Sequence, residues 1–283
     1  MTTDDEGFVP LFNGRDLTGW YATPRSYHEL WPGGPTLQEA VPGMFPDDYN
    51  ERAAEHPAVW TVEDGAIVGR QDTPGSGWGG YLESEGTYGD FELVLEANPD
   101  WPADTGIMLR KLPHTSQGIQ VLVDHRKSGS IAGFFGNGTG SFHAVPFALD
   151  ARCDDDGNAV GLGPDDPETS VEPFGERKRQ MLAYAATMEE FLDAWRWLDW
   201  NELRVRIVGA KPTVTSWVNG VKIAELDMAK LDTPNYDADA VADLLGPRGH
   251  ISFEVHDNDP VLGDSRWGAG AACRWRNIRI KEL

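Results

Sequence analysis

The chain has 283 residues, with 24 basic and 46 acidic side chains and a net charge of −22 at pH 7. A chain this acidic repels nucleic acid and anionic membrane surfaces, so we expect neither as a partner. No apolar run approaches the roughly 18 residues needed to cross a bilayer. The hydrophobic content of 40% allows a sizeable core, and the length suits one large β domain.

The cysteines and the N-terminus indicate a compartment. Cys153 and Cys273 lie far apart in the sequence, and two isolated thiols favour a reduced protein over a disulfide-stabilised one. The first residues, MTTDDEGFVP, are acidic and lack the apolar segment of a signal peptide. We therefore expect a cytoplasmic protein.

The first 70 residues are predicted to contain short strands and one long irregular segment. Asn13-Gly14 is a turn signal after the first strand. Residues 21–59 are polar and rich in Pro and Gly, which is typical of a long excursion over the surface. Residues 60–70 (WTVEDGAIVGR) alternate around Asp64-Gly65, which predicts a hairpin.

Three segments, residues 90–97, 106–110 and 118–124, alternate apolar and polar side chains. A period of two predicts strands with one buried face. If the three strands share one sheet, their second face carries carboxylate, guanidinium and amide groups that could bind a ligand, rather than the Ser, Thr and Lys typical of a solvent-exposed face. That face collects Glu92, Glu96, Arg110, Gln120 and Asp124.

The middle of the chain is less regular. Residues 128–147 are rich in Gly and aromatic residues, with a strand predicted at 131–135 and a loop that carries His143. This segment lacks the features of a phosphate or dinucleotide loop. Residues 148–176 are acidic and predicted to be irregular. Residues 187–197 (TMEEFLDAWRW) form the clearest helix, because Thr187 and Glu190 make a capping box.

The last third returns to strands. Residues 200–208 alternate, and residues 212–225 form a second hairpin around Asn219-Gly220. Residues 249–256 place Glu254 and His256 in the same phase, so both point the same way. Ten or more strands without a βαβ rhythm predict two packed antiparallel sheets.

Several segments, taken together and in order, resemble one family. They are LFNGRDLTGW, WTVEDGAIVG with YGDFELVLE, DTGIMLR, DWNELRVRI, WVNGVKIAELD, RGHISFEVHD and RWRNIRI. They are similar to the 3-keto-disaccharide hydrolase domain. The resemblance implies an all-β, concanavalin A-like β-sandwich (jelly roll) of two antiparallel sheets with one or two short inserted helices. It also implies a single domain over residues 1–283, with insertions at residues 21–59 and 148–197.

The resemblance further implies a substrate class, namely glycosides already oxidised to a ketone at C3 of the sugar. The ketone acidifies the hydrogen on C2, so that a base can form an enolate and the aglycone can leave C1. Water then adds to the resulting enone, although direct hydrolysis stays an alternative. This chemistry requires a base, a group that stabilises the enolate oxygen, and a proton donor for the leaving group.

The chain departs from the family pattern in one strand. Many family members read Gly-aromatic-Glu-Val-Gln where this chain has Gly118-Ile119-Gln120-Val121-Leu122. An acid is thus replaced by Gln120, and an amide by Leu122. The late strand often carries Gln where this chain has Glu254. We interpret the two changes as a carboxylate that has moved across the sheet, which leaves the identity of the base open.

The predicted catalytic residues are Arg110, Glu254, His125 and His143. Arg110 would stabilise the enolate, with a structural ion pair as the alternative. Glu254 or a histidine would act as the base, because neutral imidazole suits that role near pH 7. The predicted substrate-binding residues, for each of which a solvated polar or structural role is the alternative, are Gln120, Asp124, Trp217, His256 and Glu96.

No cofactor is expected, and no zinc-type spacing is present. The acidic segments 154–158 and 256–259 could hold calcium, but the first lacks the full calcium-loop pattern. A divalent cation therefore stays open as an alternative. Cys153 is unsupported as a nucleophile, because its acidic surroundings disfavour the thiolate.

Two other functions are compatible with a sandwich fold. A retaining glycoside hydrolase needs two carboxylates about 5–5.5 Å apart, and the strand motifs Glu-x-Asp-x-Glu and Glu-x-Asp-x-x-Glu are absent from the sequence. A non-catalytic sugar-binding module needs only aromatic platforms and hydrogen bonds. The Arg, Glu and His content of the predicted face favours an enzyme, with an oxidised sugar as its small-molecule partner.

Overall fold

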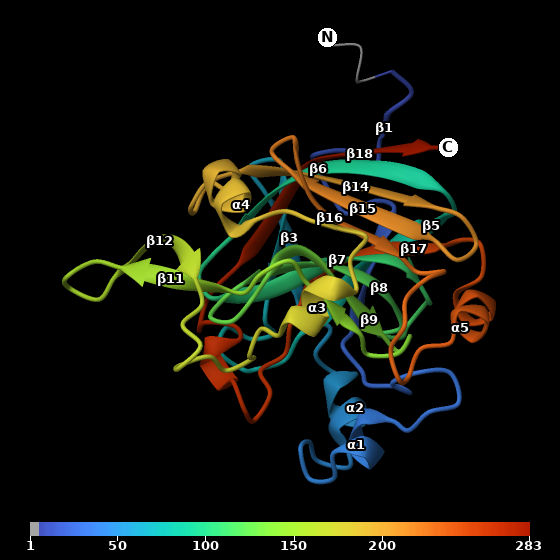
Figure 1. Ribbon diagram of the computed structural model, residues 1–283, viewed down its shortest axis with the longest axis horizontal. Coiled ribbons are helices and arrows are strands. Elements are labelled where there is room, and N and C mark those ends of the chain that lie inside the picture. The colour runs from blue at the N-terminus through green and yellow to red at the C-terminus, as the bar shows by residue number, and fades with distance from the viewer. Residues whose placement is uncertain (1–5) are drawn as a thin grey trace.

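The computed structural model describes residues 6–283 and consists mainly of two antiparallel sheets packed face to face (Figure 1). Within these residues, one sheet has nine strands, in the order β13-β16-β15-β14-β6-β18-β4-β3 with β1 paired to β18. Its strands are β1 (Val9–Pro10), β3 (Val59–Glu63), β4 (Ala66–Arg70), β6 (Phe91–Pro99), β13 (Tyr184–Ala185), β14 (Asn201–Val208), β15 (Thr213–Val218), β16 (Val221–Asp227) and β18 (Cys273–Glu282).

The second sheet has seven strands in the described residues, in the order β10-β9-β8-β7-β17-β5-β2. Its strands are β2 (Trp20–Pro24), β5 (Gly80–Tyr88), β7 (Ala103–Lys111), β8 (Gly118–His125), β9 (Ile131–Asn137), β10 (His143–Ala144) and β17 (Gly249–Val255). A separate hairpin of β11 (Leu149–Cys153) and β12 (Ala159–Pro164) projects from one side of the molecule (Figure 1).

The predicted fold, an all-β concanavalin A-like jelly-roll sandwich of two antiparallel sheets, is confirmed. Residues 6–283 contain more helical segments than the one or two short helices expected: α1 (Leu37–Ala40), α2 (Tyr49–Ala53), α3 (Glu176–Gln180), α4 (Met188–Ala194), α5 (Ala238–Leu245) and the 3₁₀ turn η2 (Gly263–Ser265). The predicted capping box of Thr187 and Glu190 starts α4. None of the helices in the described part of the chain is long and apolar enough to cross a membrane.

Both predicted hairpins are confirmed, and their turns show why the sequence marks them. The β3–β4 hairpin turns at Asp64 and Gly65, with φ values of 49° and 77°. The β15–β16 hairpin turns at Asn219 and Gly220, with φ values of 47° and 83°. Two successive positive φ values define the turn that matches the twist of paired strands, and Asn-Gly and Asp-Gly adopt it most readily.

The core lies between the two sheets and is filled by the apolar phase of their strands. Leu93 of β6, Ile107 of β7 and Val121 of β8 belong to this one cluster. Phe253 of β17 stacks on Trp275 of β18 with 4.6 Å between ring centres, which joins the two layers directly. Burial of each such side chain stabilises the fold by roughly 1.5–3 kcal/mol, so the alternation fixes which face of each strand points inward.

The assumption that the three strands between residues 90 and 124 share a sheet is wrong. β7 and β8 pair with each other, whereas β6 pairs with β14 and β18 in the opposite sheet. The chain crosses between the layers after Pro99. Two residues predicted to bind substrate therefore lie on the outer face of the nine-stranded sheet, where Glu96 pairs with Arg276 at 2.6 Å and Trp217 lies beside Arg204.

Residues 25–53 cover the outer face of the seven-stranded sheet, on the side away from the core (Figure 1). Tyr27, Phe45 and Tyr49 pack into a small aromatic cluster of their own, with 4.6 Å between the ring centres of Phe45 and Tyr49. Both tyrosine hydroxyls donate to the buried carboxylate of Asp257, just beyond β17. This segment is thus attached to the sheet and forms a wall above it.

Candidate functional site

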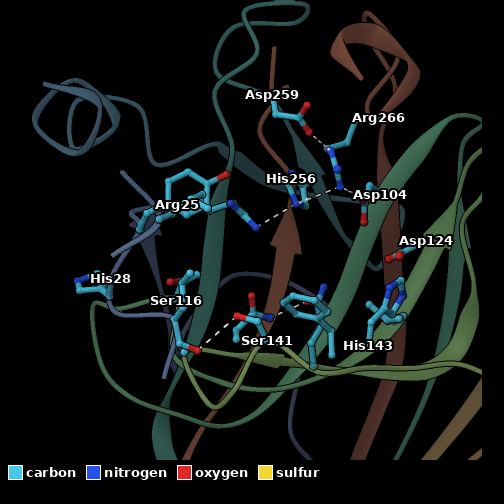
Figure 2. Close-up of a pocket in the computed structure, with 18 of the residues that line it drawn as sticks. Arg25, His28, Asp104, Ser116, Asp124, Ser141, His143, His256, Asp259 and Arg266 are labelled. Atoms are coloured by element: carbon cyan, nitrogen blue, oxygen red, sulfur yellow. Dashed lines mark hydrogen bonds and ion pairs between the residues drawn. The ribbon is translucent and has the colours of Figure 1, made fainter. Parts of the chain in front are cut away.

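A cavity of about 210 Å³ lies on the outer face of the seven-stranded sheet. Its floor is polar and comes from β7, β8 and β9, including Asp104, Gln120 and Asp124. The facing wall comes from residues 25–44 and includes the apolar side chains of Leu30 and Met44. Figure 2 shows side chains from both parts pointing into the cavity. The pocket is therefore built from regular strands on one side and an irregular segment on the other.

Two aspartates on the floor face each other across the β7–β8 ladder. Asp104 and Asp124 are directly opposite each other in the strand register. They are only 2% and 3% exposed. Two buried carboxylates in this position repel each other when both are ionised. The pair therefore retains one proton more readily than two separate carboxylates would.

The surrounding cations are distributed unequally between the two aspartates. Asp104 accepts hydrogen bonds from Arg126 Nε at 2.8 Å and from Arg266 Nη1. Asp124 has a guanidinium nitrogen of Arg126 no nearer than 3.8 Å. Its Oδ1 atom receives no hydrogen bond from an N–H or O–H group in the described residues. The arrangement favours ionised Asp104 and protonated Asp124.

The pKa values of the two aspartates are shifted in opposite directions, in agreement with this geometry. Burial alone would raise the pKa of Asp104, but the guanidinium groups of Arg126 and Arg266 outweigh it and hold the pKa well below its ordinary value. Burial raises the pKa of Asp124 well above its ordinary value, and the charge on Asp104 adds to this rise. Paired carboxyl groups whose pKa values are driven apart are a common basis for acid–base chemistry.

The two arginines are held by further carboxylates at the pocket rim. Arg126 also donates to Glu172, from the acidic segment that was predicted to be irregular. Arg266 donates through Nε to Asp259 at 2.6 Å. Because each guanidinium spans two acids, its position is fixed by both. The cluster is therefore rigid before any ligand arrives.

A second chain of hydrogen bonds runs under the floor to Glu254. Asn137 donates to Gln120 Oε1 at 2.7 Å, and Gln120 Nε2 donates to Glu254. Arg25 Nε donates to the other oxygen of Glu254 at 2.7 Å. Glu254 is fully buried, whereas Arg25, Gln120 and Asn137 line the cavity. The structure thus places Glu254 behind the binding surface, where it orients the groups that form it.

His256 lies between two guanidinium groups. Its Nε2 atom is 2.9 Å from Arg25 Nη2 and 3.4 Å from Arg266 Nη1. Guanidinium groups only donate, so Nε2 accepts and the proton is on Nδ1, which donates to the carbonyl of Asp257 at 2.7 Å. His256 lines the cavity, as expected of a substrate-binding residue, and its Nε2 lone pair is already engaged.

The two histidines predicted as alternative bases lie in different places. His143 lines the cavity, and burial, with a contribution from Lys178, lowers its pKa to about 4. His125 is not among the lining residues. It follows Asp124 directly and so points to the opposite side of β8. There its Nδ1 atom lies 2.8 Å from the carbonyl oxygen of Asp100, among three tryptophans.

Arg110 does not line the cavity, because a bulge changes the phase of β7. His250 pairs with Lys111 and Ser252 pairs with Met108, so β7 has one extra residue at this point. Arg110 has φ +47° and reaches Asp90 at 2.9 Å. Lys111 takes the polar phase in its place and pairs with the buried Glu83 at 2.6 Å. A bulge of this kind cannot be seen in an alternating sequence.

The catalytic role of Arg110 stays a prediction that one variant can test. The resemblance implies 3-keto-glucosides as substrates. Because Arg110 lies outside the pocket lining and pairs with Asp90, we expect Arg110→Ala to keep turnover of such a substrate within about threefold. Because the Arg110 side chain is only 1% exposed, its truncation leaves a buried void, and the free energy of unfolding should fall by about 2–5 kcal/mol. Steady-state kinetics and urea unfolding measure the two effects. Loss of turnover in a variant that is still folded under the assay conditions would restore the catalytic role.

Several pocket residues were not singled out from the sequence. Arg126 and Asp104 could have been found, because they continue the polar phase of the predicted strands by two residues. Glu172, Arg25 and Arg266 lie in irregular segments that carry no periodic signal. In residues 6–283, His, Cys, Asp and Glu side chains do not gather in threes in a way that could hold a metal ion.

The fold and the pocket describe a β-sandwich protein with a polar cavity on one sheet. The chain belongs to the family described as the 3-keto-alpha-glucoside-1,2-lyase-like domain, whose match covers residues 7–281. The resemblance seen in the sequence is therefore confirmed, and membership connects the protein to carbohydrate chemistry.

Comparisons with other proteins add only distant likenesses. A proposed glycosyl hydrolase from Parabacteroides distasonis ATCC 8503 is 16% identical, with a TM-score of 0.47, over 100% of this chain and 98% of that chain. The carbohydrate-binding module CBM66 from Bacillus subtilis is 11% identical, with a TM-score of 0.39, over 80% of this chain and 92% of that chain. No curated protein sequence matches the chain significantly.

Proposed function

We propose that this protein cleaves the glycosidic bond of 3-keto-glycosides in the cavity on the seven-stranded sheet. Membership of the 3-keto-alpha-glucoside-1,2-lyase-like family over residues 7–281 is the observation that carries the proposal. The cavity supports it, because neutral proton-transfer groups and guanidinium groups converge there from several strands and loops. Such convergence in one concave site is typical of an active site.

The substrate chemistry defines what the pocket must supply. A base takes the proton from C2, next to the ketone, and the electron pair moves to the ketone oxygen as an enolate. The enolate then expels the aglycone oxygen from C1, and this oxygen takes up a proton. Water adds to C1 of the enone and a proton returns to C2, which gives the free 3-keto-sugar. Each proton transfer by a positioned group contributes about 10²–10⁴-fold in rate.

The lining residues supply these functions as follows. His143 is the base, since a pKa of about 4 keeps its imidazole neutral at pH 7. The guanidinium of Arg25 stabilises the enolate oxygen, in the role that the sequence assigned to Arg110. Gln120, Asn137 and His256 bind the sugar hydroxyls. Glu254 contributes by orienting Arg25 and Gln120.

The test is a panel of 3-keto-glycosides incubated with the protein in deuterium oxide, with products analysed by mass spectrometry. We expect free aglycone and a 3-keto-sugar that carries deuterium at C2, because the enolate is protonated from solvent. Product without deuterium would replace elimination by direct hydrolysis. Absence of turnover for every keto-sugar, combined with binding of an unoxidised oligosaccharide, would overturn the proposal in favour of a binding module. Release of nitrophenol from an unoxidised glucoside would indicate an ordinary glycosidase.

A further inference from the structure

We propose that Asp124 is the general acid of this site and protonates the leaving aglycone oxygen, while Asp104 remains ionised as its fixed partner. The inference rests on the proposed function and adds the proton donor that the reaction requires. The sequence predicts Glu254 or a histidine as the base and Asp124 as a substrate-binding residue. The geometry points to a different role for Asp124, because a protonated carboxyl group can give a proton.

The first support is the strand register. Asp104 and Asp124 face each other on neighbouring strands and are buried. Two buried carboxyl groups this close together are more stable with one proton between them than with both ionised. The position of the proton follows from the cations. Arg126 and Arg266 both donate to Asp104 Oδ2, so the ionised form is favoured there.

The other acids around the cavity accept hydrogen bonds from donors that Asp124 lacks. Glu172 accepts from Arg126, and Asp259 accepts from Arg266 and from two backbone N–H groups at 2.8 and 2.9 Å. Glu254 is bonded to Arg25 and Gln120. These donors hold Glu172 and Asp259 as carboxylates, and Glu254 has donors to both of its oxygens. Among the buried acids that line the cavity in the described residues, Asp124 is the one without a strong donor bond.

The reaction step balances as follows. Asp124 transfers its proton to the aglycone oxygen as the C1–O bond breaks, and the electron pair of the enolate forms the C1–C2 double bond. Asp124 is then ionised beside Asp104, with Arg126 at 3.8 Å to offset the new charge. When water adds to C1, one of its protons returns to Asp124. His143 exchanges the proton taken from C2 with solvent and returns a solvent proton to C2, so the net change consumes one water molecule.

Several charged groups face Asp124 and set its pH dependence. Asp104 on β7 and Glu172 in the acidic segment raise its pKa, while Arg126 lowers it. Lys178 of α3 and His143 of β10 lie close enough to interact with the same cluster. Because burial and Asp104 outweigh the cations, Asp124 stays protonated at pH values where an exposed aspartate is ionised. Turnover that depends on this acid therefore decreases as the pH rises through the raised pKa.

The substitution Asp124→Asn separates a proton donor from a structural group. The amide of Asn can still donate to Asp104, so the fold should be retained, but it has no proton to give. We expect kcat for a 3-keto-glucoside with an alkyl aglycone to fall by about 10²–10⁴-fold. For a 3-keto-glucoside with a nitrophenyl aglycone, kcat should fall by less than tenfold, because nitrophenolate leaves without taking up a proton. The exchange of the C2 hydrogen with deuterium oxide should remain close to wild type.

Controls make the outcomes distinct. The matched control is Asp227→Asn, because Asp227 forms a surface ion pair with Lys230 at the end of β16. This substitution should leave kcat unchanged for both substrates. In the wild type, the decline as the pH rises through the raised pKa of Asp124 should appear for the alkyl substrate and not for the nitrophenyl substrate, which tests the proposal without any variant. Equal losses for both aglycones in Asp124→Asn, or no loss, would overturn the role of Asp124. A wild-type protein that turns over neither substrate would instead overturn the proposed function.

Discussion

Replacement of Arg25 by Met is expected to lower the free energy of unfolding by about 3–5 kcal/mol, which is the usual cost of leaving a buried charge without its partner. Arg25 is 5% exposed and donates to Glu254 at 2.7 Å. It also pairs with Asp257 at 2.9 Å. Both carboxylates are fully buried. Met fills a similar volume, so the loss reflects the two uncompensated charges rather than a cavity.

Urea unfolding followed by circular dichroism measures this effect. Arg70→Met is the matched control, because Arg70 forms a pair of similar length, 2.7 Å, with Glu63 at the surface. That pair is partly exposed, and its loss should cost at most about 1 kcal/mol. Equal stability losses in the two variants would contradict the view that the Arg25 cluster is buried and interdependent. A preserved fold in Arg25→Met would also allow its turnover to be measured.

Acidification is expected to destabilise the protein between pH 6.5 and about 4 through two histidines, the buried His125 and the half-buried His143. Burial lowers the pKa of both His125 and His143 to about 4, from an ordinary value of 6.5. In this interval the unfolded chain takes up a proton at each imidazole and the folded chain does not. Stability is therefore full above pH 6.5, decreases as the pH falls, and levels off near pH 4. Each histidine contributes about 3 kcal/mol to the change.

Unfolding free energies at half-unit pH steps test this expectation. His125→Asn is the informative variant, because an amide N–H can replace the donor to the carbonyl of Asp100 but does not titrate. Its slope against pH should be smaller than that of the wild type by about 1.4 kcal/mol per unit, which corresponds to one proton. An unchanged slope would mean that His125 is accessible to protons in the folded state. The carboxyl groups titrate in both proteins and cancel in the comparison.

The sandwich could be predicted because its signals are local. Asp64-Gly65 and Asn219-Gly220 define their turns by backbone conformation alone, and the alternation in β7 and β8 needs only one buried face. Which strands become neighbours is not a local property. The segment of β6 alternates like β7, and only the crossing after Pro99 places it in the other sheet. That difference moved Glu96 away from the site.

Residues chosen from the sequence reach the cavity only where they continue the alternating pattern of a strand. Gln120, Asp124 and His256 line the cavity, because each follows the polar phase of its strand, and their role in substrate binding stays a prediction. Arg110 was displaced by a single extra residue in β7, which a period of two cannot reveal. Arg25 and Arg266 approach the floor of the cavity from irregular segments. The residues that they contact there lie far from them in the sequence. Their positions depend on the completed fold, and so no short stretch of sequence encodes them.

The cavity is built from two parts of the chain, a floor of strands and a wall formed by an irregular segment. This division affects how substrate preference can change. The carboxyl and guanidinium groups of the floor bond to one another and to the strands below them. Leu30, Leu37 and Met44 belong to a separate stretch whose own aromatic cluster anchors it. Insertions or exchanges between residues 28 and 44 would reshape the apolar side while leaving the proton-transfer groups in register. Under the proposed function, recognition of the aglycone and cleavage of the bond can thus diverge independently, as separate modules of one pocket.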